Sequence, residues 1–143
     1  MDGAIHRAAG PGLLQELARV APNGAPTGSV VLTGGHQLRQ SYILHTPGPV
    51  WHGGTRGEPE LLASCYRSCM ALAQEKGIRS IAFCSISTGV YGYPIEQAAP
   101  LALATVRDFL TAHPQTPIER VLFALFGASE FEVFARELTR MGD

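Results

Sequence analysis

A turn rich in glycine and hydroxyl side chains, from Ser87 to Pro94, contains the residues of this chain best suited to chemistry. It follows an apolar run, Ile81–Ile86, that predicts a buried strand, and it precedes a predicted helix over Glu96–Ala112. Glycines in such a turn let backbone N–H groups face an anion, and the N-terminus of the following helix favours negative charge. The spacing is neither that of a P-loop nor that of a dinucleotide-binding fingerprint. An ordinary turn between a strand and a helix would also explain these glycines.

The cysteines and histidines form no pattern typical of a metal site or of a catalytic nucleophile. Cys65 and Cys69 stand four residues apart on the apolar face of a predicted helix, and Cys84 stands near the end of a predicted strand. All three are expected to be small core residues. No close pair among the five histidines has metal-ligand spacing. The sequence therefore implies no bound metal and no cofactor.

The elements that must position the turn alternate along a single domain, residues 1–143. The pattern predicts strands at 29–33, 41–46, 80–85 and 120–126, and helices at 3–9, around Leu13, at 58–76, at 96–112 and from Ser129 onward. Continuous apolar strands between amphipathic helices predict an α/β fold of three layers, with a sheet buried on both faces. In such folds ligands bind beyond the carboxyl ends of strands, so the turn and the segment after Phe126 should share one rim. Gly77 should cap the long helix, and Ser129 with Glu132 matches a capping box.

The composition limits the classes of function. The formal net charge is −1 and charged residues make up 16% of the chain, with no basic cluster, so there is no electrostatic footprint for nucleic acid. No apolar run approaches the roughly 18 residues that span a bilayer, and the N-terminus has no signal-peptide pattern. The sequence predicts a cytoplasmic protein.

Several stretches, in order along the chain, resemble the macro domain, and within that family the MacroD type. They are Asp2–Pro11, Pro26–Thr33, Tyr42–Thr46, Gly48–Trp51 and Ile86–Gly92. The resemblance implies a three-layer α/β/α sandwich around a mixed sheet, and a site for ADP-ribose or for an ADP-ribosylated protein. It implies a hydrolase origin, with removal of mono-ADP-ribose from acidic side chains or deacetylation of O-acetyl-ADP-ribose as the reaction. The alternative is a binding module that holds ADP-ribose or a related nucleotide without turnover.

The same resemblance suggests roles for individual residues. It assigns the phosphates of ADP-ribose to a loop made of Ser87, Thr88, Gly89, Val90, Tyr91 and Gly92. Tyr91 is expected to cover the distal ribose, with an exposed turn aromatic as the alternative. Phe126 is expected to line the cleft, with ordinary core packing as the alternative. Asp2 is implicated in hydrolysis, in which it would orient a water for attack at the anomeric carbon. Asp2 would equally suit the N-cap of the first helix.

The resemblance also predicts that the chain is truncated at the N-terminus. The family's first strands and its Asn-Ala-Ala-Asn segment have no counterpart before Met1. The bias toward Arg, Ala, Gly and Pro is typical of a GC-rich, bacterial genome. The hypothesis is a late-start version of a longer domain. One absent strand is interior to the family's sheet, and the edge this leaves predicts self-association, or a form that needs an upstream segment or a partner.

Overall fold

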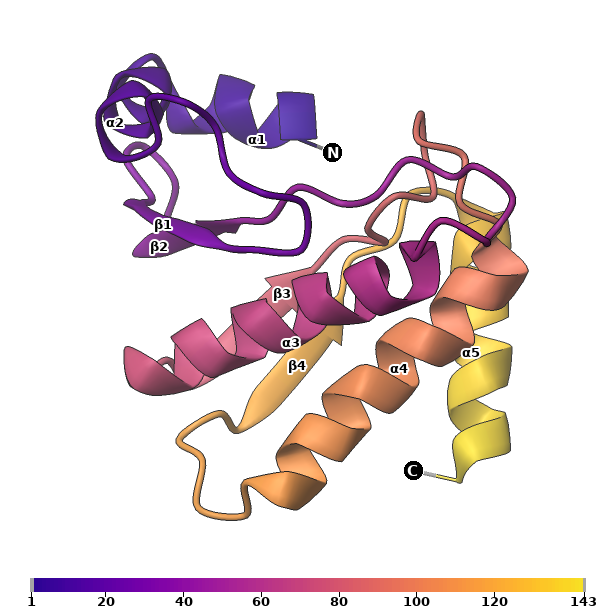
Figure 1. Cartoon of the computed structure of the whole chain (residues 1–143). Helices are drawn as coiled ribbons and strands as arrows, with labels where there is room; N and C mark the ends of the chain where they lie inside the picture. Colours follow the sequence, from indigo (N-terminus) through magenta and orange to yellow (C-terminus); the bar gives the residue numbers. More distant parts are fainter. Residues whose placement is uncertain (1, 143) are drawn as a thin grey trace.

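The computed structural model describes residues 2–142, in which helices and short strands alternate (Figure 1). In chain order the elements are α1 (Asp2–Ala9), α2 (Gly12–Val20), β1 (Val31–Gly34), β2 (Tyr42–His45), α3 (Glu58–Glu75), β3 (Ser80–Phe83), α4 (Ile95–Ala112), β4 (Arg120–Phe123) and α5 (Ala128–Met141). None of these helices combines the length and apolar character needed to cross a membrane. The predicted helices are all present, and the strands are shorter than predicted.

The strands form two separate two-stranded sheets. β1 and β2 run antiparallel with Val31 opposite His45, whereas β3 and β4 run parallel with Ser80 opposite Arg120. The α/β class and the mixture of parallel and antiparallel pairing are thus confirmed, although the described strands do not join into one continuous sheet. Because β3 and β4 are parallel and in register, both end at one edge. The loops that follow them therefore begin side by side, as the rim prediction requires.

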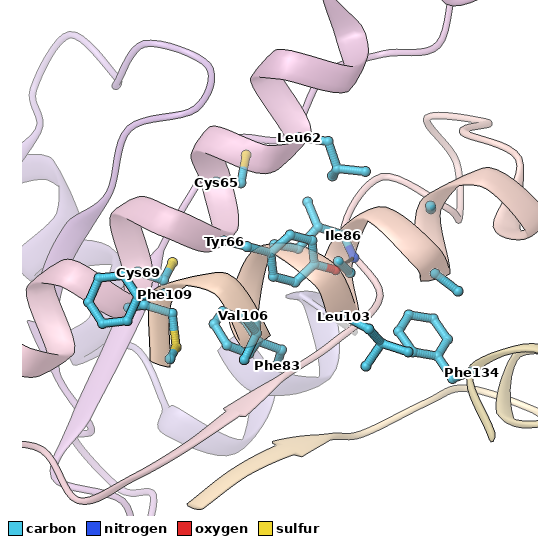
Figure 2. Close-up of a cluster of buried hydrophobic side chains, with 14 of the residues drawn as sticks. Leu62, Cys65, Tyr66, Cys69, Phe83, Ile86, Leu103, Val106, Phe109 and Phe134 are labelled. Atoms are coloured by element: carbon cyan, nitrogen blue, oxygen red, sulfur yellow. Dashed lines mark hydrogen bonds between the residues drawn. The ribbon is translucent and has the colours of Figure 1, made fainter. Parts of the chain in front are cut away.

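The core lies where α3, α4 and α5 pack against the β3–β4 pair, as Figures 1 and 2 show. Aromatic rings from four elements, α3, β3, β4 and α5, meet there. The ring of Phe83 lies 5.0 Å from that of Tyr66 and 5.6 Å from that of Phe123, which in turn lies 5.2 Å from Phe134 between centroids. Burying each side chain of this size stabilises the fold by roughly 1.5–3 kcal/mol. The carboxyl ends of β3 and β4 therefore rest on a packed base.

Helix α3 shows why these residues fold as they do. Its buried side chains follow a period of three to four residues, so they form one apolar face: Leu62, Cys65, Tyr66, Cys69, Met70 and Ala73. The prediction that Cys65 and Cys69 belong to the core is confirmed. Burial raises the pKa of both thiols, that of Cys69 to about 12. Desolvation also raises the pKa of the half-buried Cys84, so none of the three is poised as a thiolate nucleophile.

The end of α3 confirms the predicted glycine cap. Gly77 takes a left-handed backbone conformation, with φ of +69°. Its N–H donates to the carbonyl of Gln74 (3.1 Å), and the N–H of Ile78 donates to that of Ala73 (2.9 Å). These two bonds form a Schellman motif, which ends the helix and turns the chain toward β3.

The N-terminal part, residues 2–46, packs around β1 and β2. Helix α2 contacts β1 and α1, and its residue Leu13 is fully buried. A carboxylate oxygen of Glu16 accepts the N–H of Gly34 (3.1 Å) and lies 2.7 Å from Nε2 of His36. The His36 hydrogen bond, followed by that of Gly34, lowers the pKa of Glu16 and so favours its ionised form. Hydrogen bonds of Glu16 thus stabilise this part of the chain together with the buried side chain of Leu13.

Two predictions about local structure are wrong. First, the β3–β4 pair is not buried on both faces, since Ala82 and Leu122 lie on an exposed side. Helices α3, α4 and α5 contribute to the cluster around this pair, whereas α2 contacts β1 of the other sheet. Second, Ser129 and Glu132 form no capping box. Helix α5 begins at Ala128, and its N-cap residue, Gly127, has a positive φ of +94° and no side-chain cap.

Candidate functional site

The loop over residues 87–92 emerges from the carboxyl end of β3 and projects from the molecule (Figure 1). Two positive φ angles shape it: +69° at Ser87 and +75° at Gly92. The bend is closed by two backbone bonds, from the N–H of Gly92 to the carbonyl of Gly89 (3.0 Å) and from that of Tyr93 to Ser87 (2.9 Å). A left-handed serine is uncommon and costs conformational energy, so the surrounding structure must hold it there.

The backbone donors of this loop are the feature that sets it apart. Within residues 2–142, the N–H groups of Thr88, Gly89, Val90 and Tyr91 have no protein acceptor. Four consecutive free N–H groups beyond a strand end form a site that favours an anion. The N-terminus of α4, which starts at Ile95, adds a favourable dipole. The geometry therefore suits a phosphate or diphosphate bound by amides.

The base of the loop is fixed by Tyr66 of α3. Its hydroxyl oxygen accepts the N–H of Ile86 (3.1 Å) and donates to the carbonyl of Cys84 at 3.4 Å. Figure 2 shows this hydroxyl directed at Ile86 from within the apolar cluster. Desolvation raises the pKa of Tyr66 well above its usual range, so the group stays a neutral phenol. The core thereby determines where the loop starts.

The side chains of the loop divide into inward and outward groups. Val90 is fully exposed and Tyr91 is 46% exposed, so both are available to a ligand. The Ser87 hydroxyl is buried without a hydrogen-bond partner among the described residues and faces Gly48. Thr88 Oγ1 lies 2.7 Å from Ser85 Oγ and donates to Glu130 Oε2 at 2.9 Å. Neither hydroxyl of the Ser-Thr pair points freely outward, and the amides remain the loop's main donors.

Phe126 lies three residues beyond β4 with its side chain 84% exposed. The alternative that it is an ordinary core residue is therefore wrong. Its N–H donates to Glu130 Oε1 (3.1 Å), while the other oxygen of the same carboxylate accepts the Thr88 hydroxyl. Glu130, 42 positions from Thr88 in sequence, thus joins the loop after β3 to the loop after β4. The sequence did not predict a role for Glu130, because the capping-box pattern in this segment involves Ser129 and Glu132.

Asp2 is the first residue of α1, and its side chain is 90% exposed. Its carboxylate lies 3.3 Å from Nε2 of His6, one turn further along the helix. The imidazole of His6 in turn lies 6.3 Å from that of His45, whose Nε2 is 2.9 Å from Thr33 Oγ1. A carboxylate in water beside an imidazole can accept a proton or orient a water molecule. Figure 1 shows the start of α1 on the same side of the molecule as the loop after β3.

A second carboxylate that sequence reasoning missed is Glu58, the first residue of α3, which is 1% exposed. It accepts the backbone N–H groups of His52, Gly54 and Arg56 at 2.7, 3.0 and 2.7 Å. In the sequence it resembles any acidic residue in a first helical turn. The loop that it organises carries Trp51, whose N–H donates to the carbonyl of Tyr91 (2.9 Å).

Other features of the described residues do not add to this site. Between residues 2 and 142 there is no group of three or more His, Cys, Asp or Glu side chains placed to hold a metal ion. Two surface hollows lie elsewhere, one of about 460 Å³ after α4, around His113, and one of about 320 Å³ between α4, β4 and α5.

Comparison with known proteins agrees with this geometry. The profile of the Macro domain family matches residues 1–102, so this chain belongs to the macro domain family. A macro domain-containing protein of Chlorobaculum tepidum is 50% identical over 138 residues, 96% of this chain and 78% of that protein. The O-acetyl-ADP-ribose deacetylase of Salmonella gallinarum is 48% identical over 145 residues, 100% of this chain and 80% of the enzyme.

The solved structures that resemble this chain include macrodomains. The macrodomain of Oceanobacillus iheyensis with ADP superposes with a TM-score of 0.89 at 43% identity, covering 98% of this chain and 75% of that one. The Trypanosoma brucei macrodomain in complex with ADP-ribose superposes with a TM-score of 0.88 at 45% identity, covering 96% and 56%. The resemblance inferred from the sequence and the α/β fold class are confirmed.

Proposed function

We propose that this macro domain binds ADP-ribose and that the amides of residues 88–91 hold its diphosphate. The observation that carries the proposal is the run of four N–H groups without a protein acceptor among the described residues. Backbone amides beyond a strand end, close to a helix N-terminus, bind phosphate groups well. Relatives of this chain named for O-acetyl-ADP-ribose, and a related macrodomain solved with ADP-ribose, support this choice of ligand.

The proposed contact set is the one that the sequence predicted. It consists of Ser87, Thr88, Gly89, Val90, Tyr91 and Gly92 from the loop, and Phe126 from the neighbouring loop. Tyr91 and Phe126 supply exposed aromatic faces suited to a ribose or a base. Ser87 and Gly92 contribute backbone geometry, since both take positive φ angles.

Calorimetry with ADP-ribose tests the binding proposal, and Gly89→Ala is the informative variant. A Cβ at Gly89 would meet no protein atom within 4 Å, and the glycine has no positive φ. The free energy of unfolding should therefore stay within about 0.5 kcal/mol of the wild-type value. The affinity for ADP-ribose should fall by about tenfold or more, because a methyl group would stand between the amides and the diphosphate. An unchanged affinity would place the ligand elsewhere.

We further propose hydrolysis at the same site, with Asp2 as the catalytic residue. Its carboxylate would orient a water molecule and accept its proton as the water attacks the anomeric carbon of the distal ribose. The bond to the leaving carboxylate, of a protein side chain or of an acetyl group, breaks as the new C–O bond forms. The exposed carboxylate beside His6 supports this role, as do the relatives named O-acetyl-ADP-ribose deacetylase.

The alternative is a module that binds without turnover, and one comparison separates the two. Release of ADP-ribose from a mono-ADP-ribosylated protein and of acetate from O-acetyl-ADP-ribose would be measured for the wild type and for Asp2→Asn. An enzyme should lose about 10²- to 10⁴-fold in rate in the variant while it keeps its affinity. Asp108→Asn, a change of an exposed aspartate on α4, is the control. Binding without any release by the wild type would favour the module.

We also infer self-association through strand edges, as the sequence suggested. Each of the strands between residues 2 and 142 has one paired neighbour, so each keeps an edge of unpaired backbone groups. Leu122 of β4 is 45% exposed beside such an edge. Edges of this kind pair readily with a second chain. Sedimentation velocity should show a concentration-dependent dimer that Leu122→Lys weakens, and a monomer at all concentrations would contradict the inference.

A further inference from the structure

The loop between β2 and α3 is organised around a carboxylate that faces inward. Glu58 is 1% exposed, yet three backbone N–H groups, of His52, Gly54 and Arg56, converge on its two oxygens. Charge-assisted bonds of this kind are about twice as strong as neutral ones. The segment that supplies them, residues 52–56, contains no helix or strand. Its conformation therefore depends on the carboxylate more than on regular backbone pairing.

Glycines make this arrangement possible. Gly53, Gly54 and Gly57 have φ angles of +96°, +90° and +79°, values that a side chain disfavours. They turn alternate N–H groups toward one point, where Glu58 lies. Burial alone would raise the pKa of Glu58, but the N–H donors outweigh it and hold the pKa at about 2. The carboxylate is thus ionised throughout the physiological pH range.

The organised segment reaches the ligand loop through Trp51. The backbone N–H of Trp51 donates to the carbonyl of Tyr91 (2.9 Å), which lies in the proposed diphosphate loop. Its indole lies 4.6 Å from the ring of Tyr93, between centroids. The same indole rests on Gly54, where a Cβ would come within 2.8 Å of it. A continuous set of contacts therefore connects Glu58 with the loop of free amides.

We propose that Glu58 is a positioning residue for the ligand loop of this chain. Its carboxylate binds the backbone N–H groups of His52, Gly54 and Arg56. This segment in turn holds Trp51 in place, so that the backbone N–H of Trp51 fixes the carbonyl of Tyr91. With that carbonyl held away from the rim, the neighbouring N–H groups stay turned toward the ligand. The proposal rests on the proposed function, since it concerns the affinity of the same site. Glu58 itself does not touch ligand, because it is buried under its own loop.

The experiment uses the one tryptophan of the chain as a probe of the segment. ADP-ribose affinity and Trp51 emission would be measured for the wild type, Glu58→Ala, Glu58→Gln and Glu60→Gln. Glu60 is the matched control, an exposed acid in the same helical turn. Each protein would be measured alone, with sodium formate, and with sodium chloride at equal ionic strength. Formate is the probe because it can occupy the space that the missing carboxylate leaves.

The expected result has three parts. Glu58→Ala lowers the affinity about tenfold or more, because three partly buried hydrogen bonds lose their acceptor. Its Trp51 emission shifts to longer wavelength, and formate, but not chloride, reverses both changes. Glu58→Gln, which keeps the side-chain volume, changes both observables in the same direction, and it replaces the alanine variant if that variant does not fold. Glu60→Gln matches the wild type.

Several results would overturn the proposal. They are a wild-type affinity in Glu58→Ala, a lost affinity with unchanged Trp51 emission, or a loss that formate does not reverse. If the wild type itself binds no ADP-ribose, the proposed function fails. The arrangement around Glu58 is then judged on the emission of Trp51, and an unchanged emission in both Glu58 variants overturns it.

Discussion

The two ends of this macro domain differ in how they are held together. Within the described residues, the whole buried apolar cluster lies between Leu62 and Phe134, on α3, α4, α5 and the β3–β4 pair. The segment over residues 2–46 has only Ala9 and Leu13 among its buried apolar side chains. It relies in addition on polar bonds such as the one from Gly34 to Glu16. Local stability follows apolar contact density, so the N-terminal segment should open first.

This difference bears on the two proposed activities. The loop of free amides is built on the packed part, through Tyr66, Trp51 and Glu130. Asp2 is carried by the sparsely packed part. Binding needs only the loop of free amides, whereas hydrolysis also needs Asp2 to be placed precisely. Small displacements of a catalytic group lower the reaction rate strongly. Affinity and turnover should therefore respond to different substitutions.

A pair of fully buried leucines gives the largest expected contrast. Leu62 belongs to the apolar cluster, whereas Leu13 is equally buried but lies outside it. Leu62→Ala should cost about 4 kcal/mol of unfolding free energy, because close-packed neighbours cannot fill the cavity. Leu13→Ala should cost about 2 kcal/mol, because its sparser surroundings can relax. Urea denaturation followed by circular dichroism measures both, and equal costs would remove the distinction between the two parts.

The next effect concerns the contact between Gly48 and the ligand loop. A Cβ at Gly48 would overlap Ser87 Oγ and approach Ile86 Cγ2 to 2.7 Å. Gly48→Ala should cost about 1–3 kcal/mol of stability, as overpacking does. It should also lower ADP-ribose affinity about tenfold, since the left-handed Ser87 must move. Gly34→Ala is the control, because the nearest atom to its added Cβ would lie 3.8 Å away. Calorimetry that finds equal affinities for both variants would disprove the coupling.

Phe126 allows binding to be changed without a change in stability. Its side chain is 84% exposed, so Phe126→Ala should leave the unfolding free energy within about 0.5 kcal/mol. Stacking on a base or sugar is worth about 1–3 kcal/mol, so ADP-ribose affinity should fall about tenfold. Phe131→Ala, at a 62% exposed aromatic of α5, should leave the affinity unchanged. If both variants bind alike, Phe126 lies outside the site.

The smallest expected effect is one of pH, and it distinguishes the two parts directly. Desolvation, followed by the charge of His6, lowers the pKa of His45 in β2. The folded state then binds fewer protons than the unfolded state, so its stability falls as the pH drops through about 6.5. The pKa of Glu58 is also lowered on folding, to about 2, so its contribution has the same sign but a more acidic window: it is intact above the unfolded value near 4.3 and is lost only as the pH falls toward 2.

Hydrogen exchange, corrected for its intrinsic pH dependence, checks this expectation. Between pH 7 and 5.5 protection should fall in residues 31–45 and stay constant in residues 51–58. His45→Asn should remove the pH dependence of the first segment, because an amide can still bond to Thr33 Oγ1 without titrating. Equal loss of protection in both segments would show that the chain opens as one unit.

Local chemistry explains how much could be predicted from the sequence. The glycine cap at Gly77 depends on neighbours within four residues, as does the apolar face of α3, and both predictions are confirmed. The family resemblance is confirmed as well, because its motifs are continuous stretches of chain. The capping box at Ser129 failed even though its motif is local. Helix α5 instead starts one residue earlier, after Gly127, whose φ is positive.

The sequence by itself determined the alternation of helices and strands, the turn at residues 87–92 and the glycines that let its amides turn outward. These depend on backbone sterics and on periodicity, which act over a few residues. Only the tertiary structure decided that four N–H groups of that turn have no protein acceptor among the described residues. It also decided that Tyr66 fixes Ile86 at the start of the turn, that the backbone N–H of Trp51 donates to Tyr91, and that Glu130 accepts the Thr88 hydroxyl. Such contacts join residues up to 42 positions apart, and a pairing at that distance is selected by packing, which no local pattern encodes.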